Sequence, residues 1–349
     1  MAILVTGAAG FIGSALCRAL LARGDHVVGI DNLNSYYDVQ LKMDRLRWIE
    51  DYATDDAFTF IQADFADAAA LEAAVAGRAI EHIVHLGAQA GVRYSIENPR
   101  EYVQSNLAGH LNVLELARHM AVRHLVYASS SSVYGANRNL PFRVEDRVDR
   151  PVSLYAATKR ADELMSETYA HLYRIPQTGL RFFTVYGPWG RPDMAVWLFT
   201  DAILSDRPIK VFNNAMMQRD FTYIDDIVSG VVAALDHPPA DDGQVKAGGS
   251  VEPHRLYNIG NNQAEPLARL IEVIERACGK EAIRDFQPMQ PGDVPATYAD
   301  IDAIGTDLGF APTTNIDVGI PAFVDWFRAY KLGETRNVNR AVAATSANA

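Results

Sequence analysis

The sequence predicts an α/β protein, in which a doubly wound and mainly parallel sheet is covered by helices on both faces and followed by a smaller C-terminal α/β lobe. Three observations predict this fold class. Short apolar strands alternate with helical patterns up to residue 184, a glycine-rich turn follows the first strand, and turn-rich sequence replaces the alternation afterwards. Because ligands bind at the carboxyl ends of the strands in such sheets, residues just past each strand are the first candidates for a functional site.

The first strand and the turn after it carry the most specific local signal. Ala2–Thr6 runs into Gly7-Ala-Ala-Gly10-Phe-Ile-Gly13 and a helical pattern, and the next strand ends on Asp31. Together these form the Rossmann-type dinucleotide-binding fingerprint: Gly7 permits the tight turn, Gly10 the approach of a pyrophosphate, and Gly13 close helix–strand packing. The helix N-terminus offers free N–H groups to phosphates. Asp31 can accept hydrogen bonds from ribose hydroxyls and would repel a 2′-phosphate, which favours NAD over NADP.

Further elements follow in the same order along the chain. Strands are expected at residues 58–62, 82–86, 124–128 and 178–183, with helices at 67–77, 99–120 and 152–173 between them. Residues 1–184 therefore form the predicted NAD-binding Rossmann domain, and residues 220–237 and 255–262 are expected to return to it.

The C-terminal part has a different pattern. We expect a loop at 186–192, a helix at 194–204, a strand at 209–212, a helix at 225–235 capped by Asp225 or Asp226, a strand at 256–259, and helices at 266–278 and 318–330. Residues 185–219 and 263–332 form the predicted second lobe. The Pro-, Gly- and Asp-rich residues 237–253 predict a mobile loop, and the tail 333–349 is expected to be disordered.

Composition and charge narrow the class of partner. The net charge of −11, with no run of Lys and Arg, argues against nucleic-acid binding, although a pocket can still be locally positive. No apolar stretch reaches membrane-spanning length. Cys17 and Cys278 lie far apart, which favours buried thiols in a reducing compartment over a disulfide or a metal site. The chain begins with a strand, so no signal peptide is expected and the predicted location is cytoplasmic.

Tyr155 and Lys159 are the strongest candidates for chemistry. Residues four apart share a helix face, so both side chains can point at one spot. A phenol has a reference pKa of about 10 and is a poor base at neutral pH, but a nearby ammonium and an oxidised nicotinamide would both favour the phenolate. A Tyr-x-x-x-Lys pair alone is a weak signal. The upstream glycine turn and the serine run Ser129–Ser132 at a strand end strengthen it.

These motifs, taken in order, resemble the extended short-chain dehydrogenase/reductase family and, within it, the nucleotide-sugar epimerases. The resemblance rests on the glycine turn, Ser129-Ser130, Tyr155-x-x-x-Lys159, Arg181-Phe-Phe-Thr-Val-Tyr-Gly-Pro188, Arg219-Asp-Phe-Thr-Tyr and Pro291-Gly-Asp293. The stretches Asp31–Asp38, Ala88–Ser95, Ser129–Gly135, Arg191–Met194 and Met289–Pro295 are most similar to the UDP-glucuronate 4-epimerase branch.

The resemblance implies a reaction and roles for residues. Tyr155 would take the proton of the sugar 4-hydroxyl while C4 passes a hydride to NAD, Lys159 would favour the phenolate and bind the nicotinamide ribose, and Ser130 would donate to the same oxygen. The 4-keto sugar would rotate and take the hydride back on its other face, which interconverts UDP-glucuronate and UDP-galacturonate. Because a 4-keto glucuronate is a β-keto acid, its carboxylate must be held out of alignment with the carbonyl; Ser130, Ser131, Ser132 and Thr184 are the expected donors, with Arg191 and Arg93 as further candidates.

The remaining contacts follow from the same resemblance. For the nucleotide we expect Arg219 on the diphosphate, Asp293 on the uridine ribose and Phe212 against uracil, with Gln290 nearby. The expected cofactor contacts are Gly7, Gly10, Phe11, Ile12, Gly13, Asp31, Asn32, Asp64, Phe65, Leu86, Gly87, Ala88, Gln89, Asn106, Ser129, Tyr155 and Lys159. No metal site is expected.

Alternatives differ at a few positions. Relatives that decarboxylate UDP-glucuronate or dehydrate sugars carry an acid shortly after the catalytic Ser or Thr, where this chain has Ser131 and Ser132. UDP-glucose 4-epimerases typically carry Asn at the position of Thr184 and Arg at that of Gln290, so an epimerase of UDP-glucose or a UDP-N-acetylhexosamine stays open. A non-catalytic NAD-binding regulator is disfavoured because Tyr155 and Lys159 are both present. The family also implies a homodimer formed by the helices at 99–120 and 152–173.

Overall fold

A seven-stranded sheet forms the centre of the molecule, in a computed structural model that describes residues 2–290 and 293–333. Each strand pairing in it is parallel. In spatial order the strands are β10 (His254–Ile259), β6 (Gln177–Phe182), β5 (His124–Ser130), β4 (His82–His85), β1 (Ala2–Thr6), β2 (His26–Asp31) and β3 (Phe58–Gln62). The order runs outward in both directions from β1 and β4, so the predicted Rossmann-type doubly wound sheet is confirmed.

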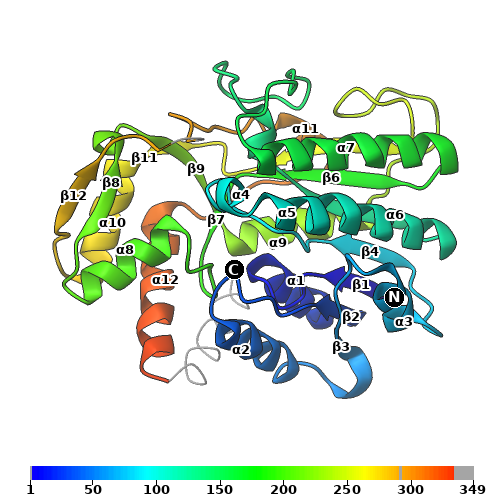
Figure 1. The fold of residues 1–349 in the computed structure, drawn as a ribbon, viewed down its shortest axis with the longest axis horizontal. Coiled ribbons are helices and arrows are strands. Elements are labelled where there is room, and N and C mark those ends of the chain that lie inside the picture. The colour runs from blue at the N-terminus through cyan, green and yellow to red at the C-terminus, as the bar shows by residue number, and fades with distance from the viewer. Residues whose placement is uncertain (1, 291–292, 334–349) are drawn as a thin grey trace.

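Helices cover both faces of this sheet (Figure 1). One layer holds α1 (Phe11–Ala22), α2 (Val39–Glu50) and α9 (Ile224–Asp236), and the other holds α3 (Ala68–Val75), α5 (Pro99–Tyr102), α6 (Gly109–His119) and α7 (Leu154–Tyr173). Side chains alternate between the layers along each strand: in β1, Ile3 and Val5 pack with the α1 layer, whereas Leu4 packs with the α3 layer. The apolar strands predicted from sequence are thus buried from both sides.

A smaller lobe lies beside the carboxyl ends of the strands (Figure 1). Its strands are β7 (Thr184–Tyr186), β9 (Gln218–Tyr223) and β11 (Ala264–Pro266) in one small sheet and β8 (Ile209–Phe212) and β12 (Arg284–Gln287) in another. Its helices are α8 (Ala195–Leu204), α10 (Leu267–Cys278) and α12 (Ile316–Lys331), and α11 (Asp302–Leu308) and the short α4 (Tyr94–Glu97) complete the set of described α-helices. Residues 334–349 of the predicted disordered tail lie outside the described residues.

Three local expectations differ from the structure. The helix predicted at 99–120 is α5 and α6 joined by a π-helical segment, Val103–Ala108. Neither Asp225 nor Asp226 caps α9, because the helix already begins at Ile224. Asp226 instead accepts hydrogen bonds from the backbone of Thr313 and Thr314, which ties α9 to the start of the last helix. The third difference is helix α2, which is not predicted from the sequence.

Candidate active site

A large cavity lies between the carboxyl ends of the central strands and the smaller lobe. Its volume of about 1160 Å³ exceeds what one drug-sized ligand usually needs, so a dinucleotide and a second ligand can share it. Among the described residues that line it, seven are Lys or Arg and three are Asp: Lys42, Arg93, Lys159, Arg191, Arg207, Lys210 and Arg219 against Asp31, Asp193 and Asp293. The cavity of this acidic protein is therefore locally positive and suited to anionic ligands.

The glycine turn at the cavity floor fits a pyrophosphate. Gly7 has φ +72°, and a Cβ there would lie 2.8 Å from the backbone nitrogen of Gly87. A Cβ on Gly13 would lie 2.1 Å from the carbonyl oxygen of Gly7, so the close packing that Gly13 permits is between α1 and the turn itself. The first-turn N–H groups of α1 have no partners within the helix and point at this edge of the sheet.

The far end of the floor holds a carboxylate and a buried lysine. Asp31 ends β2, lines the cavity, and accepts a hydrogen bond from the backbone of Leu33 at 2.8 Å. Lys42 lies 3.7 Å from the same carboxylate and donates to Asn34 at 2.9 Å. A carboxylate held in this way keeps an acceptor for ribose hydroxyls at the strand end, which fits NAD.

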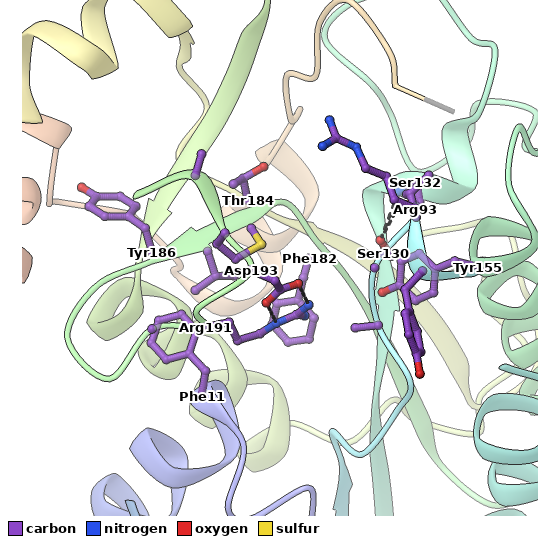
Figure 2. Close-up of a pocket in the computed structure, with 18 of the residues that line it drawn as sticks. Phe11, Arg93, Ser130, Ser132, Tyr155, Phe182, Thr184, Tyr186, Arg191 and Asp193 are labelled. Atoms are coloured by element: carbon purple, nitrogen blue, oxygen red, sulfur yellow. Dashed lines mark hydrogen bonds and ion pairs between the residues drawn. The ribbon is translucent and has the colours of Figure 1, made fainter. Parts of the chain in front are cut away.

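The predicted catalytic residues come from two adjacent elements. Ser130 ends β5, Tyr155 and Lys159 lie one turn apart on α7, and all three line the cavity. Lys159 is almost fully buried, and its Nζ donates to the carbonyl oxygen of Ala128 at 2.9 Å and to Asp162 at 3.1 Å. The hydroxyl of Ser130 accepts from the backbone N–H of Ser132 and donates to its Oγ, both at 3.1 Å. Figure 2 shows Ser130, Ser132 and Tyr155 on one side of the cavity.

Beneath these residues lies a buried charged network. Glu163 on α7 accepts from Ser129 at 2.6 Å and from Nε and Nη2 of Arg181 at 2.8 and 3.0 Å. Arg181 also donates to Tyr134 at 3.0 Å. Burial raises the pKa of Glu163, but the Arg181 charge, the hydrogen bonds from Arg181 and Ser129 and the Arg160 charge together outweigh burial and hold the pKa below its ordinary value. The network fixes β5, β6 and α7 relative to one another, so the serine strand end and the Tyr–Lys helix are positioned by the same contacts.

The opposite side of the cavity carries Thr184 and Arg191 (Figure 2). Thr184 begins β7 with its side chain half-buried. Arg191 lines the cavity, where its guanidinium pairs with both carboxylate oxygens of Asp193, and Tyr36 donates to the same carboxylate at 3.1 Å. Burial opposes the ionised form of Asp193, but the guanidinium more than compensates and lowers the pKa of this carboxyl.

Three of the residues predicted for the nucleotide, Asp293, Phe212 and Arg219, lie at the mouth of the cavity, together with Arg93, which was predicted for the sugar carboxylate. Arg93 forms an ion pair with Asp293 at 2.8 Å, and its guanidinium lies 4.5 Å from the centre of the Phe212 ring. Arg219 donates to the backbone oxygens of Gln218 and Pro295. These residues line the cavity, as do the remaining predicted contacts Phe11, Ile12, Asn32, Phe65, Leu86, Gly87, Ala88, Gln89, Ser129, Ser131 and Gln290.

Two predicted cofactor contacts do not line the cavity. Asp64 accepts hydrogen bonds from the side chain of Asn32 and the backbone of Ala66. Asn106, in the π-helical segment, accepts from the backbone of Gln89 and donates to Gln89 and Thr158. Both residues hold neighbours around the cofactor site through these hydrogen bonds, and their direct contact with the cofactor stays a prediction.

The family model for the NAD dependent epimerase/dehydratase family matches residues 3–260 of this chain. The chain belongs to this family. As a family member it is similar to the protein CapI of Staphylococcus aureus, with 49% identity over 335 residues, 95% of this chain and 99% of that protein. It is also similar to a probable UDP-glucuronate 4-epimerase of Rhizobium meliloti, with 46% identity over 94% of this chain and 97% of the relative.

The chain is also similar to a solved epimerase structure that contains a nucleotide sugar and NAD. The UDP-glucuronic acid 4-epimerase of Bacillus cereus, in complex with UDP-glucuronic acid and NAD, superposes with a TM-score of 0.83 and 35% identity, covering 95% of this chain and all of that one. The cofactor of this family is NAD, and the glycine turn, the first turn of α1 and Asp31 are the residues here that fit it.

Helix α2 supplies two residues of this family member that sequence reasoning missed. Lys42 neighbours Asp31, and Arg45 donates to the carbonyl oxygens of Ala9, Trp189 and Gly190. Arg45 thereby joins the glycine turn to the loop that carries Arg191. The buried face of α2 includes these two charged side chains, which breaks the apolar periodicity. One signal for this helix is present in the sequence: Asp38 is of a residue type that is preferred at helix N-caps. In the structure its side chain accepts a hydrogen bond from the backbone N–H of Gln40.

Proposed function

We propose that the protein is an NAD-dependent 4-epimerase that interconverts UDP-glucuronate and UDP-galacturonate. The observation that carries the proposal is a set of hydroxyl donors on two sides of a positive cavity, Ser130, Ser131 and Ser132 on one side and Thr184 on the other. Tyr155 and Lys159 line the same cavity. Hydroxyl and backbone donors suit a sugar carboxylate, and these four residues contribute no carboxylate of their own. In this proposal the large sheet binds NAD, and the smaller lobe binds the UDP portion of the substrate.

The chain's own residues supply the acid–base part of the reaction. Bound NAD would accept a hydride from C4 of the sugar and return it to the opposite face. Tyr155, as the phenolate, takes the proton of the 4-hydroxyl and gives it back to the oxygen of the epimer. Lys159 presents a positive charge next to that phenolate, and Ser130 donates a hydrogen bond to the same oxygen. Because each proton and hydride is returned, the reaction needs no added oxidant.

The carboxylate must be held while the ketone turns. At the 4-keto stage, loss of carbon dioxide requires the C–CO2 bond to align with the carbonyl π system, so fixed donors to the carboxylate protect the intermediate. Thr184, Ser131 and Ser132 are the donors proposed for this role, because the single hydroxyl proton of Ser130 is assigned to the 4-oxygen. Arg191 is paired with Asp193 through Nε and Nη2, so a contact from its guanidinium to the substrate would come from the remaining N–H groups.

Thr184→Val tests the carboxylate contact. We expect kcat/KM for UDP-glucuronate to fall by about 10- to 100-fold, because a hydrogen bond to a charged group contributes about 1.5–3 kcal/mol. The variant should also release carbon dioxide during turnover, since its substrate is held less firmly. Steady-state kinetics with trapped carbon dioxide measures both effects, and Thr200→Val, which changes a buried hydroxyl in α8, is the matched control. Unchanged kcat/KM in Thr184→Val would exclude this contact.

The UDP portion would lie at the mouth of the cavity. Arg219 suits the diphosphate, and Phe212 offers a ring for uracil, with Asp293 as an acceptor for ribose hydroxyls. Arg93 and Asp293 are paired with each other, so substrate binding would exchange part of this ion pair for contacts to the nucleotide. Gln290 in place of an arginine reduces the positive charge here, which is a departure from UDP-glucose 4-epimerases.

Proton NMR of the purified protein with UDP-glucuronate and no added NAD tests the proposed function. We expect UDP-galacturonate to accumulate to an equilibrium mixture. Formation of UDP-xylose and carbon dioxide would favour the decarboxylase alternative. Turnover of UDP-glucose or a UDP-N-acetylhexosamine with no turnover of UDP-glucuronate would favour the second epimerase alternative.

We also propose that two copies of the protein pair through α6 and α7. We further propose that the protein works in the reducing cytoplasm, in keeping with its two buried free thiols. Helices α6 and α7 lie side by side (Figure 1), and their outer faces expose Leu111, Leu164 and Leu172. In the described part of the chain no helix is long and apolar enough to cross a membrane. A second copy of the same face would bury these leucines in a two-helix by two-helix contact.

Leu164→Glu tests this interface. We expect the dimer dissociation constant to rise by at least about 100-fold, because a carboxylate would be desolvated at the centre of the contact. Analytical ultracentrifugation over a range of concentrations measures it. Val318→Glu, which changes an equally exposed apolar residue on α12, should leave the dimer intact. A wild-type protein that is monomeric at all concentrations would contradict the proposal.

A further inference from the structure

Asp162 lies directly behind the Tyr155–Lys159 pair. The three residues lie along one face of α7, at spacings of four and three. The carboxylate of Asp162 and the ammonium of Lys159 are 3.1 Å apart, and their side chains are 1% and 3% exposed. An ammonium has three protons: one goes to the carbonyl oxygen of Ala128 and one to Asp162. The third is left for the cavity, so Asp162 helps to determine where Lys159 points.

The charge of Asp162 is poorly compensated by other groups. Its Oδ1 is buried with no hydrogen-bond partner. The adjacent Glu163, in contrast, is paired with Arg160 and Arg181 and accepts from Ser129, so its charge is neutralised locally. Asp162 is therefore the carboxylate whose field acts on Lys159.

The other titratable groups around Asp162 are neutral at working pH. His110 on α6 and Tyr127 on β5 face it, and His85 on β4 faces Lys159. Burial lowers the pKa of both histidines, to about 3 for His85, and raises that of Tyr127. Burial also raises the pKa of Asp162 to about 6, against the pull of Lys159, so the carboxylate is ionised at neutral pH and gains a proton in mild acid.

We propose that Asp162 is a positioning residue, which holds the Lys159 ammonium toward the cavity and, through its negative charge, sets the pH at which Tyr155 becomes the phenolate base. Lys159 favours the phenolate, and an ionised Asp162 offsets part of that effect. Two helical turns, about 10 Å, separate Asp162 from Tyr155, close enough for its charge to act across a poorly solvated site. The inference rests on the proposed acid–base role of Tyr155.

The test uses Asp162→Asn in the enzyme with NAD bound, because asparagine keeps the shape and an oxygen that accepts from Lys159. We expect the acid limb of kcat/KM to move to lower pH by on the order of half to one unit, with KM for UDP-glucuronate little changed. The phenolate absorbance, taken as the difference from Tyr155→Phe in the same background, should shift in the same direction. Glu167→Gln removes a carboxylate from the same helix that pairs with His254 and should leave both curves in place.

Several outcomes decide the matter. An unchanged acid limb and an unchanged phenolate titration in Asp162→Asn, or a shift of either to higher pH, would overturn the proposal. Asp162→Ser, which is also uncharged, must shift the titration in the same direction as Asp162→Asn. Unfolding of both variants would assign Asp162 to stability alone and would also overturn it. A wild-type protein that does not turn over UDP-glucuronate, but whose phenolate titration responds to Asp162→Asn, would contradict only the proposed function.

Discussion

Replacing Tyr155 by phenylalanine is expected to lower kcat by at least about 1000-fold, because the variant lacks the hydroxyl that we propose takes and returns the proton of the 4-hydroxyl. The change removes one oxygen. The ring keeps its edge contact with Tyr102, at 5.9 Å between centres. Lys159 keeps both of its partners, Ala128 and Asp162. NAD binding should therefore survive.

The measurement combines UDP-glucuronate turnover with the amount of NAD that copurifies with Tyr155→Phe. Tyr169→Phe is the matched control, since its hydroxyl donates to Glu115 on α6, outside the cavity. We expect the control to keep full activity. More than a tenth of wild-type kcat in Tyr155→Phe would remove this residue from the acid–base role, and loss of NAD would mean that the change acts through cofactor binding.

The second large effect is on stability. Arg181→Met is expected to lower the free energy of unfolding by about 3–5 kcal/mol, because it leaves the buried Glu163 without its bidentate partner. Both side chains are 1% exposed. Since the pKa of Glu163 is held below its ordinary value of 4.5, this stabilisation is present above that pH and is lost as the pH falls toward the depressed folded-state pKa. The wild-type protein should therefore lose more stability than the variant on acidification.

Urea unfolding monitored by circular dichroism measures the effect of Arg181→Met. Arg174→Met is the matched control, because Arg174 forms exposed ion pairs with Asp241 and Glu252, and such pairs contribute about 1 kcal/mol or less. Combining Arg181→Met with Glu163→Gln should restore part of the loss, since no buried charge is then left unpaired. A loss below about 1 kcal/mol in Arg181→Met would show that the network does not hold the strand end and the helix together.

The elements whose limits are predicted correctly are those that depend on local sequence alone. Strands β1, β3 and β8 have the predicted limits, because each is a short apolar run bounded by turn residues. Helix α2 was missed because its buried face carries Lys42 and Arg45, and charged residues at core positions hide a helical pattern. The burial of Lys42 depends on Asp31 in the preceding strand. The burial of Arg45 depends on the carbonyl oxygen of Trp189, 144 positions away in sequence.

Pairing within the site could not be predicted for the same reason. Arg93 and Asp293 were each assigned to the substrate, but the sequence does not indicate that they contact each other across 200 positions. The pairing of Arg191 with Asp193 is local, yet it depends on a loop conformation held by Arg45. Motif spacing predicted which residues line the cavity, whereas the tertiary fold determines which of them are already engaged.

The central claim is that C4 of a UDP-uronic acid is oxidised and then reduced by the same bound cofactor. The most direct measurement follows UDP-glucuronate deuterated at C4 through the reaction, with no NAD added and with the product examined by NMR and mass spectrometry. We predict UDP-galacturonate that keeps the deuterium at C4. Product that has exchanged its label with solvent, or label found only in a decarboxylated sugar, would contradict the claim.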